Sequence, residues 1–315
     1  MDLGLAFDDD DLQNFKKKID DISALPYHVK IVQPEWFESA FDVQGLHGWT
    51  EIETEQVPHA YKMSGDFHYY KQNYRKASEQ YQNALDLLPE NNVSVRQDLI
   101  ESLSRCYMYI GQTEESLHLA RNLVHDLSKE DEAHQRQSLI LLSSVCAKAG
   151  LWAEFVNCLE KLCCLQPYYA QFWSQLGDAY ANLLNEIQMR HDDADDPTPL
   201  DCQIRQLTCY TRAKLLHKSV NGTASSLVRL RNMNLIRELE KKIACAPFPE
   251  REKTLAVEFI QQEFENQATN IKESNSEVLE ICIPVHESTD DESKLSQSQL
   301  FYQRFCTWFT KDKVG

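Results

Sequence analysis

The sequence predicts an all-α protein, a right-handed superhelical solenoid of antiparallel helix pairs that is closed by C-terminal capping helices. Only 9 glycines and 10 prolines interrupt 315 residues, and the stretches between them are rich in residues that lose little side-chain freedom in a helix. Small residues also recur where paired helices would have to touch. A hydrophobic content of 42% is ample for a buried core.

The first helix pair is expected at 58–91. Gly65 and Ala77 are needed there because a larger substituent on Cβ would hold two crossing helices apart. Pro89 then ends the second helix, since proline has no N–H to donate. The residues that match the offsets of a repeat of about 34 residues are Tyr61, Gly65, Tyr74, Ala77, Tyr81, Ala84 and Pro89.

Further copies of this pattern follow in the same frame. They are expected at 97–130, 136–169 and 170–220. Ser116 and Phe155 replace the usual small residue on the second helix of the second and third copies, whereas the first helix of the fourth copy matches the pattern closely, with Gly177 at the position of Gly65. An acidic insert at 191–201 splits the fourth copy. Agreement of three to four copies in one frame predicts a repeat protein.

The segments on either side of the repeats have a different character. Residues 1–57 are expected to be acidic and irregular, and the solenoid is expected to span 58–245. An acidic helix and a flexible tail are expected at 246–297, and an amphipathic helix at 298–315. The apolar stripe of this last helix cannot remain in water unpaired. We expect it to cap the last helix pair; filling the groove and binding a partner are the alternatives.

Over 58–220 these residues resemble the tetratricopeptide repeat superfamily. More narrowly, Gln33-Pro34-Glu35-Trp36-Phe37, Gly65-Asp66 and Leu165-Gln166-Pro167 look like a vertebrate open-reading-frame family whose human member is named for its place on chromosome eight. The resemblance implies the paired-helix fold. It also implies a scaffold or adaptor that binds a protein or peptide partner, because this architecture usually supplies binding surfaces.

The first helix of each pair is expected to line a concave groove that binds such a partner. Tyrosine and methionine among charged residues are typical of contact surfaces, and a solvated face without a ligand is the alternative. The predicted groove residues are Lys62, Asp66, Tyr69, Tyr70, Glu101, Arg105, Met108, Tyr109, Lys148 and Asp178.

Chaperone-binding members of the superfamily hold a C-terminal carboxylate with a lysine and an asparagine on the first helix. Lys62 fits the lysine position, but Asp66 stands where the asparagine should be. An acidic side chain there would repel a carboxylate. We therefore expect no binding of chaperone C-terminal tails.

The sequence predicts no catalytic residues, no metal site and no cofactor. Cys158, Cys163 and Cys164 fall within one expected helix without a histidine near them in sequence, which favours core packing over zinc. The chain also lacks a Gly-x-Ser-x-Gly elbow and a glycine-rich phosphate loop. We therefore expect that the protein is not an enzyme.

The net charge of −17 repels nucleic acid and anionic lipid. One segment differs, because 205–242 holds nine basic side chains against Glu238 and Glu240. Binding of nucleic acid or phosphorylated ligands there is the alternative function, and a solvated helix face is the blander interpretation. No signal peptide or apolar run of ~20 residues occurs. The expected compartment is the reducing cytoplasm, with the nucleus as the alternative.

Overall fold

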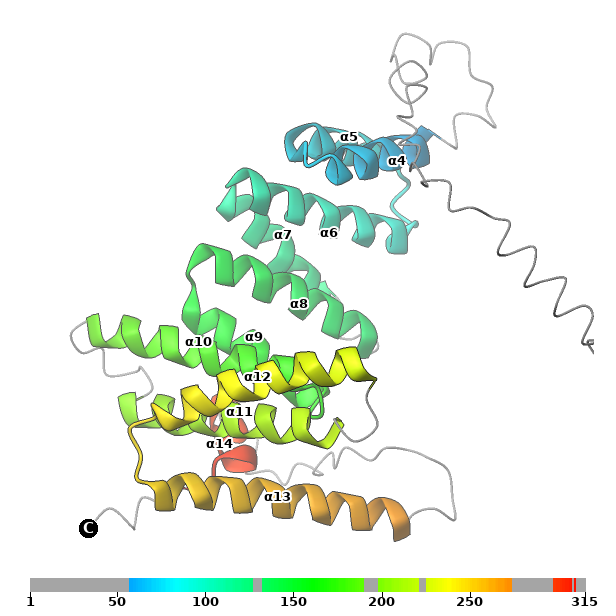
Figure 1. Ribbon diagram of the computed structural model, residues 1–315. Helices are drawn as coiled ribbons and strands as arrows, with labels where there is room; N and C mark the ends of the chain where they lie inside the picture. The colour runs from blue at the N-terminus through cyan, green and yellow to red at the C-terminus, as the bar shows by residue number, and fades with distance from the viewer. Residues whose placement is uncertain are drawn as a thin grey trace, which may run out of the picture. The chain divides into compact units, whose positions relative to one another are not determined.

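A computed structural model describes the chain in six stretches. They are residues 57–126, 132–189, 198–220, 225–273, 297–307 and 309. The chain divides into two units, Met1–Thr54 and Glu55–Gly315, and every described residue lies in the second. The expectations for 1–56, for the tail at 274–296 and for Trp308 therefore lie outside the described residues. The described part holds eleven α-helices and no strand, which confirms the all-α fold class (Figure 1).

Eight of these helices form four consecutive pairs. The pairs are α4 (Val57–Tyr70) with α5 (Tyr74–Leu87), α6 (Val93–Ile110) with α7 (Thr113–Asp126), α8 (Glu132–Ala149) with α9 (Trp152–Leu165), and α10 (Ala170–Met189) with α11 (Pro199–Val220). In the first three pairs the second helix also packs against the first helix of the next pair. The pairs therefore stack in chain order from α4 to α11 (Figure 1).

Local sequence signals set the ends of several helices. The Asn73 side chain accepts a hydrogen bond from the backbone N–H of Lys76 at 3.3 Å and so caps α5. Gly111 ends α6 with a φ of 91°, a left-handed conformation that glycine adopts without strain. Helix α11 begins at Pro199, inside the segment predicted as an acidic insert. Proline suits this first position because the N–H that it lacks would have no partner there.

The small residues that the sequence places at helix crossings do lie there. A Cβ atom on Gly65 would stand 2.6 Å from the ring of Tyr81 on α5, and one on Gly177 would stand 2.4 Å from the ring of Tyr210 on α11. Ala77 is fully buried. These glycines therefore allow an aromatic ring of the second helix to lie directly on the backbone of the first.

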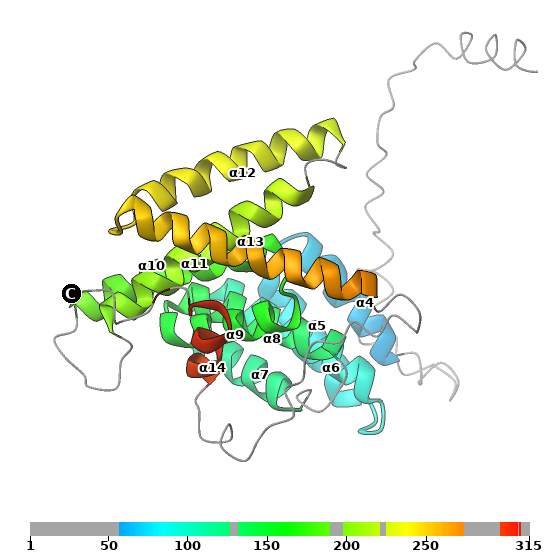
Figure 2. The same cartoon turned by 90° about the horizontal axis from the view of Figure 1, so that it is seen from below.

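Three helices follow the pairs. Both α12 (Ser226–Ala244) and α13 (Glu250–Glu273) pack against α11, whereas α14 (Gln297–Phe305) packs against α9 (Figures 1 and 2). Phe301 and Phe305 of α14 are buried, and their ring centroids lie 5.8 and 5.0 Å from that of Trp173. The last helix thus covers part of the hydrophobic core beside α9 of the third pair; that it caps the last helix pair stays a prediction.

Two buried arginines lie in the same core. Arg212 of α11 is ion-paired with Glu263 of α13, and its guanidinium carbon lies 4.8 Å from the ring centroids of both Trp173 and Phe305. Arg205 pairs with the buried Glu160 at 2.9 Å. A buried charge is tolerated when it is paired in this way, so both arginines belong to the interior.

Candidate functional site

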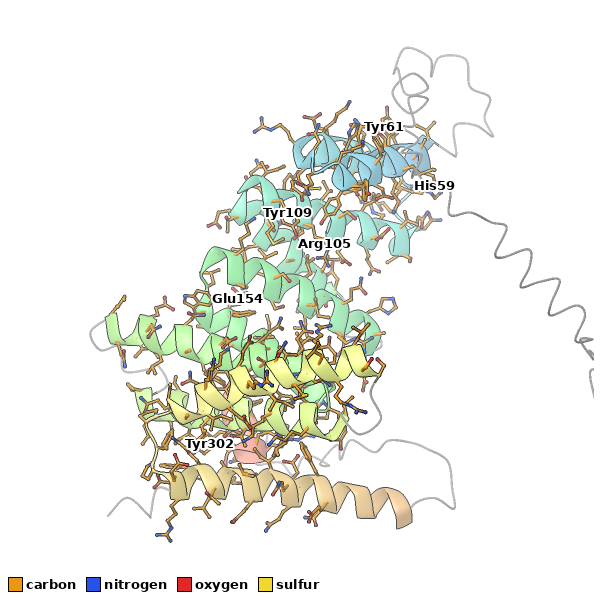
Figure 3. All side chains as sticks on the ribbon, in the orientation of Figure 1. His59, Tyr61, Arg105, Tyr109, Glu154 and Tyr302 are labelled. Atoms are coloured by element: carbon orange, nitrogen blue, oxygen red, sulfur yellow. The ribbon has the colours of Figure 1, made fainter. Side chains whose placement is uncertain are left out.

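Most of the predicted groove residues lie together on the first helices of the first three pairs. We call this set the first-helix surface. Its members are Lys62, Asp66, Tyr69, Tyr70, Asp98, Glu101, Arg105, Tyr109, Gln137 and Lys148. Arg105 and Tyr109 lie along α6, the middle helix of the three (Figure 3). Side-chain contacts join α4 to α6 and α6 to α8.

A cluster of aromatic rings forms one end of the first-helix surface. Tyr109 stacks on Tyr74 with ring centroids 4.5 Å apart and contacts Tyr69 edge-on at 6.2 Å. The Lys148 ammonium lies 4.8 Å from the Tyr109 centroid, a favourable cation–π distance. Tyr70, the residue after Tyr69 in the chain, is 84% exposed. Helices α4, α5, α6 and α8 therefore combine to hold one aromatic platform, which we call the tyrosine cluster.

Burial raises the pKa of Tyr69 to about 12, and the nearby Tyr109 adds to this effect. The Tyr69 hydroxyl therefore stays protonated at neutral pH and can donate a hydrogen bond to a ligand. Sequence reasoning did not include Tyr74 in the groove. It begins α5, a second helix, and only the folded arrangement brings its ring against Tyr109.

Paired charges run along the rest of the surface. Lys62 Nζ lies 3.2 Å from Asp66 and 3.1 Å from Asp98, which links α4 to α6. Burial alone would lower the pKa of Lys62, but hydrogen bonds to Asp98 and Asp66 outweigh this effect and raise it. The ammonium is therefore held charged between two carboxylates, an arrangement that leaves little attraction for a third.

A second set of polar contacts links α6 to α8. Arg105 pairs with Glu101 at 2.6 Å, and the Gln137 amide donates to Glu101 at 3.1 Å. These partners neutralise one another, so this part of the surface offers hydrogen-bonding groups with little net charge.

Two predicted groove residues lie elsewhere. Met108 is only 8% exposed and belongs to the hydrophobic core, so its predicted place on an open surface is corrected. Helical spacing turns Tyr109 outward and Met108, one residue earlier, inward. Asp178 lies on α10, where it accepts a hydrogen bond from the Tyr210 hydroxyl at 2.7 Å and pairs with Lys242 of α12 at 2.5 Å. It therefore joins α10 to α11 and α12.

The basic segment 205–242 does not form one continuous surface. Arg205 and Arg212 are buried, as described above. Lys218 pairs with Glu240 at 3.6 Å, and Lys242 pairs with Asp178. Four further exposed cations of this segment lie on α12, namely Arg229, Arg231, Arg237 and Lys241; of these, Arg237 donates a hydrogen bond to Asn234 at 3.3 Å.

A family model matches residues 2–191 of the chain. Its description is family of unknown function, DUF5588. The chain belongs to the DUF5588 family. The matched part ends just after α10, so the DUF5588 match includes the first-helix surface and stops before α11 to α14.

Two curated relatives are similar to this DUF5588 chain. "Uncharacterized protein C8orf76" of Homo sapiens is 30% identical over 161 residues, which cover 50% of this chain and 39% of the relative. The homolog of that protein in Rattus norvegicus is 27% identical over 158 residues, covering 49% of this chain and 38% of the relative. The match thus spans less than half of each relative's length. These relatives confirm the narrower of the two resemblances in the sequence.

A solved structure titled "Crystal structure of MamA protein" is 14% identical to this chain, with a TM-score of 0.36. The superposition covers 62% of this chain and 98% of that chain. The assignment of tetratricopeptide repeats to the DUF5588 chain stays a prediction.

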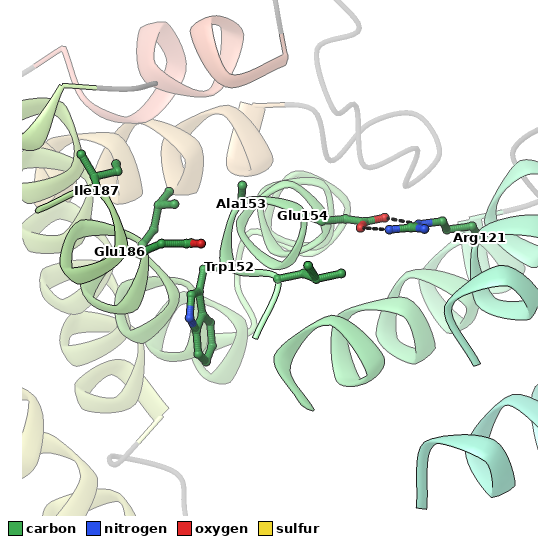
Figure 4. A pocket seen from close by; sticks show the side chains of 8 residues that line it. Arg121, Trp152, Ala153, Glu154, Glu186 and Ile187 are labelled. Atoms are coloured by element: carbon green, nitrogen blue, oxygen red, sulfur yellow. Dashed lines mark hydrogen bonds and ion pairs between the residues drawn. The ribbon is translucent and has the colours of Figure 1, made fainter. Parts of the chain in front are cut away.

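A hollow of about 220 Å³ lies between α7, α9 and α10 (Figure 4). Arg121 of α7 and Glu154 of α9 form a bidentate ion pair at its edge, with N–O distances of 2.9 and 2.6 Å. The hydrogen bond from Arg121 holds the pKa of Glu154 below its usual value. This pair joins neighbouring second helices, which indicates a structural role.

The described residues contain no group of three or more His, Cys, Asp or Glu side chains that could hold a metal ion. Among the described helices, none combines the length and apolarity needed to cross a bilayer. The nine cysteines in the described part of the chain are all free thiols.

Proposed function

We propose that this protein is a non-enzymatic scaffold that binds a protein or peptide partner along its first-helix surface. The observation that carries the proposal is the tyrosine cluster, in which the first two helix pairs place three aromatic rings side by side and the third pair adds the Lys148 ammonium. Tyrosine is enriched in interfaces and in the residues that contribute most to binding. Paired-helix folds supply surfaces of this kind for extended peptides or helices.

The geometry of the cluster favours binding for a second reason. Tyr109 is held by the stacked Tyr74, the edge-on Tyr69 and the Lys148 ammonium, so a partner that packs on these rings restricts little additional side-chain motion. Tyr70 is still free to move and can adapt to the partner. The paired charges next to the cluster would then select partners whose polar groups fit between them.

The test is proximity labelling in cells with the full-length chain and with the variants Tyr70→Ala and Tyr109→Ala. Removal of a central interface tyrosine costs about 2 kcal/mol or more of binding free energy, which is roughly a thirtyfold loss of affinity. We expect proteins labelled by the wild-type chain to be lost with Tyr109→Ala and reduced with Tyr70→Ala.

Tyr168→Ala is the matched control, because Tyr168 is also a largely exposed tyrosine and lies in the turn between α9 and α10. It should label the same partners as the wild-type chain. If Tyr109→Ala keeps the wild-type partners while circular dichroism shows a folded protein, the first-helix surface is not the binding site.

We place this function in a reducing compartment, the cytoplasm or the nucleus. Burial raises the pKa of thiols such as Cys106, which keeps them as unreactive thiols inside the helix pairs. This supports core packing as the role of these cysteines.

A further inference from the structure

The first half of α12 exposes apolar side chains. Leu227 is 79% exposed and Leu230 is 59% exposed, and Val228 and Met233 are also open to solvent. The buried residues of this helix fall mainly in its second half, on the side that faces the core. Within the described part of the chain these apolar side chains stay exposed, which makes the start of α12 a candidate contact surface.

The same half of α12 is basic. No acidic residue occurs from 225 to 237, and Arg229, Arg231 and Arg237 are all exposed. The first acidic side chain of the helix is Glu238. In a chain with a net charge of −17, this is a local region of opposite sign, and it attracts a ligand that carries negative charge.

A hollow of about 250 Å³ opens beside this region, between α10, α11 and α12. Its lining residues are Gln171 and Ser174 of α10, His217 of α11, and Val228, Arg231, Asn232, Leu235, Glu238, Leu239 and Lys242 of α12. The ion pair between Lys242 and Asp178 holds α12 against α10 next to the hollow. The hollow therefore combines three apolar side chains with the Arg231 guanidinium, and the Glu238 carboxylate lies about two turns further along α12, so a carboxylate of a partner fits at the Arg231 end.

The position of α12 relates the hollow to the first-helix surface. α12 follows the second helix α11, packs against it and is tied to the first helix α10. These are the neighbours that a fifth first helix would have in a stack of helix pairs. The hollow thus continues the side of the stack on which the first helices lie.

We propose that an acidic amphipathic helix of a protein partner docks on α12, with an apolar side chain in the hollow and a carboxylate on Arg231. This inference rests on the proposed scaffold function and names the chemistry of the partner at the α12 end of the same side. Leu227 lies one turn before Arg231 on the same side of α12, is 79% exposed and supplies further apolar contact.

Two other anionic ligands fit these features less well. Nucleic acid is held mainly by many phosphate contacts, and two arginines of the basic segment are in the core, while a phosphate strand leaves the exposed leucines without a partner. A bilayer surface accepts a helix with one continuous apolar face. Here the apolar wall lies in a hollow against α10, which a flat bilayer cannot enter.

The test is fluorescence anisotropy with the full-length chain and a labelled peptide of about 15 residues, in which leucine and glutamate repeat at helical spacing. We expect Arg231→Glu to weaken binding of this peptide at least about tenfold, the factor that corresponds to roughly 1.4 kcal/mol. Val228→Asp should weaken it similarly, because it places a charge in the apolar wall.

Arg75→Glu is the matched control, since Arg75 is an exposed arginine on α5 and its replacement changes the net charge equally. The proposal is overturned if the wild-type chain does not bind the peptide, or if Arg231→Glu and Arg75→Glu bind it equally. It is also overturned if phosphatidylserine vesicles or single-stranded RNA bind more tightly than the peptide and lose that binding in Arg231→Glu.

The two proposals can fail separately. If Tyr109→Ala loses its cellular partners while Arg231→Glu binds the peptide as tightly as the wild-type chain, the scaffold function stands and the α12 site is wrong. If the peptide depends on Arg231 while Tyr109→Ala keeps every partner, the α12 site stands and the tyrosine cluster is not the binding surface.

Discussion

Replacing Gly177 by alanine should destabilise the protein, although alanine is the better helix former. The new Cβ would stand 2.4 Å from Cε1, 2.6 Å from Cδ1 and 3.0 Å from Cζ of Tyr210. The Tyr210 ring is buried, and its hydroxyl donates to Asp178 at 2.7 Å. The ring cannot move away from the Cβ without disturbing this hydrogen bond or the packing of α10 on α11.

The magnitude follows from three contributions. Alanine in a helix interior is favoured over glycine by about 1 kcal/mol. Overpacking of a close contact costs about 1–3 kcal/mol, and a weakened hydrogen bond costs about 1 kcal/mol. The net loss is about 2 kcal/mol. For a chain of 315 residues, whose unfolding entropy is about 2.1 cal/mol/K per residue, that corresponds to a fall in Tm of roughly 3 °C.

Thermal unfolding followed by circular dichroism measures this change in a double-mutant cycle with Tyr210→Ala. If the ring contact is the cause, Gly177→Ala should be destabilising in the wild-type background and stabilising by about 1 kcal/mol once the ring is gone, because only the helix preference remains. An equal loss in both backgrounds, or a higher Tm in the single variant, would refute the proposed crossing contact.

Two further predictions concern the core beneath α14 and His217, which lines the α12 hollow. Phe305→Ala should lower the free energy of unfolding, measured in urea, by about 3–5 kcal/mol, because Phe305 is fully buried against Trp173. Leu300→Ala, on the exposed side of α14, should lower it far less. Equal losses in the two variants would contradict the capping role. Burial holds the pKa of His217 below its usual value, so the unfolded chain binds a proton first and stability should fall as pH drops below about 6.5. His217→Gln should flatten this dependence and the exposed His59→Gln should not; equal slopes would exclude His217 as its source.

The crossing points could be predicted because they depend on residue size at a fixed spacing. Gly65, Ala77 and Gly177 must be small wherever two helices touch, whatever else surrounds them. The pairing of the helices and the all-α class follow from this pattern. The same register placed Lys62, Tyr69 and the other members of the first-helix surface on the first helices, although it could not tell that Tyr74 of a second helix would stack on Tyr109.

The basic segment shows what the sequence could not predict. Arg205 and Arg212 look like part of an exposed basic face, because charged residues are mostly exposed. Their partners Glu160 and Glu263 lie 45 and 51 residues away in the chain. Only the packing of α9 and α13 against α11 brings these carboxylates within reach, and no local pattern records it. The same pairing leaves the exposed basic charge concentrated on α12.

The capping helix and the proposed binding surfaces lie against different helices, and this affects how deletions are interpreted. α14 packs on the second helix α9, and its Phe305 ring contacts Arg212, which itself is paired with Glu263 of α13. Deleting α14 therefore exposes the Trp173 side of the core and removes one of the three aromatic rings that lie against the buried Arg212, while the tyrosine cluster and the α12 hollow keep all their described lining residues. If such a deletion removes both folding and binding, it supports the capping role; if it removes binding from a protein that stays folded, it supports α14 as part of the binding site. Substitutions at Tyr109 or Arg231, which leave this core intact, are the changes that separate binding from stability.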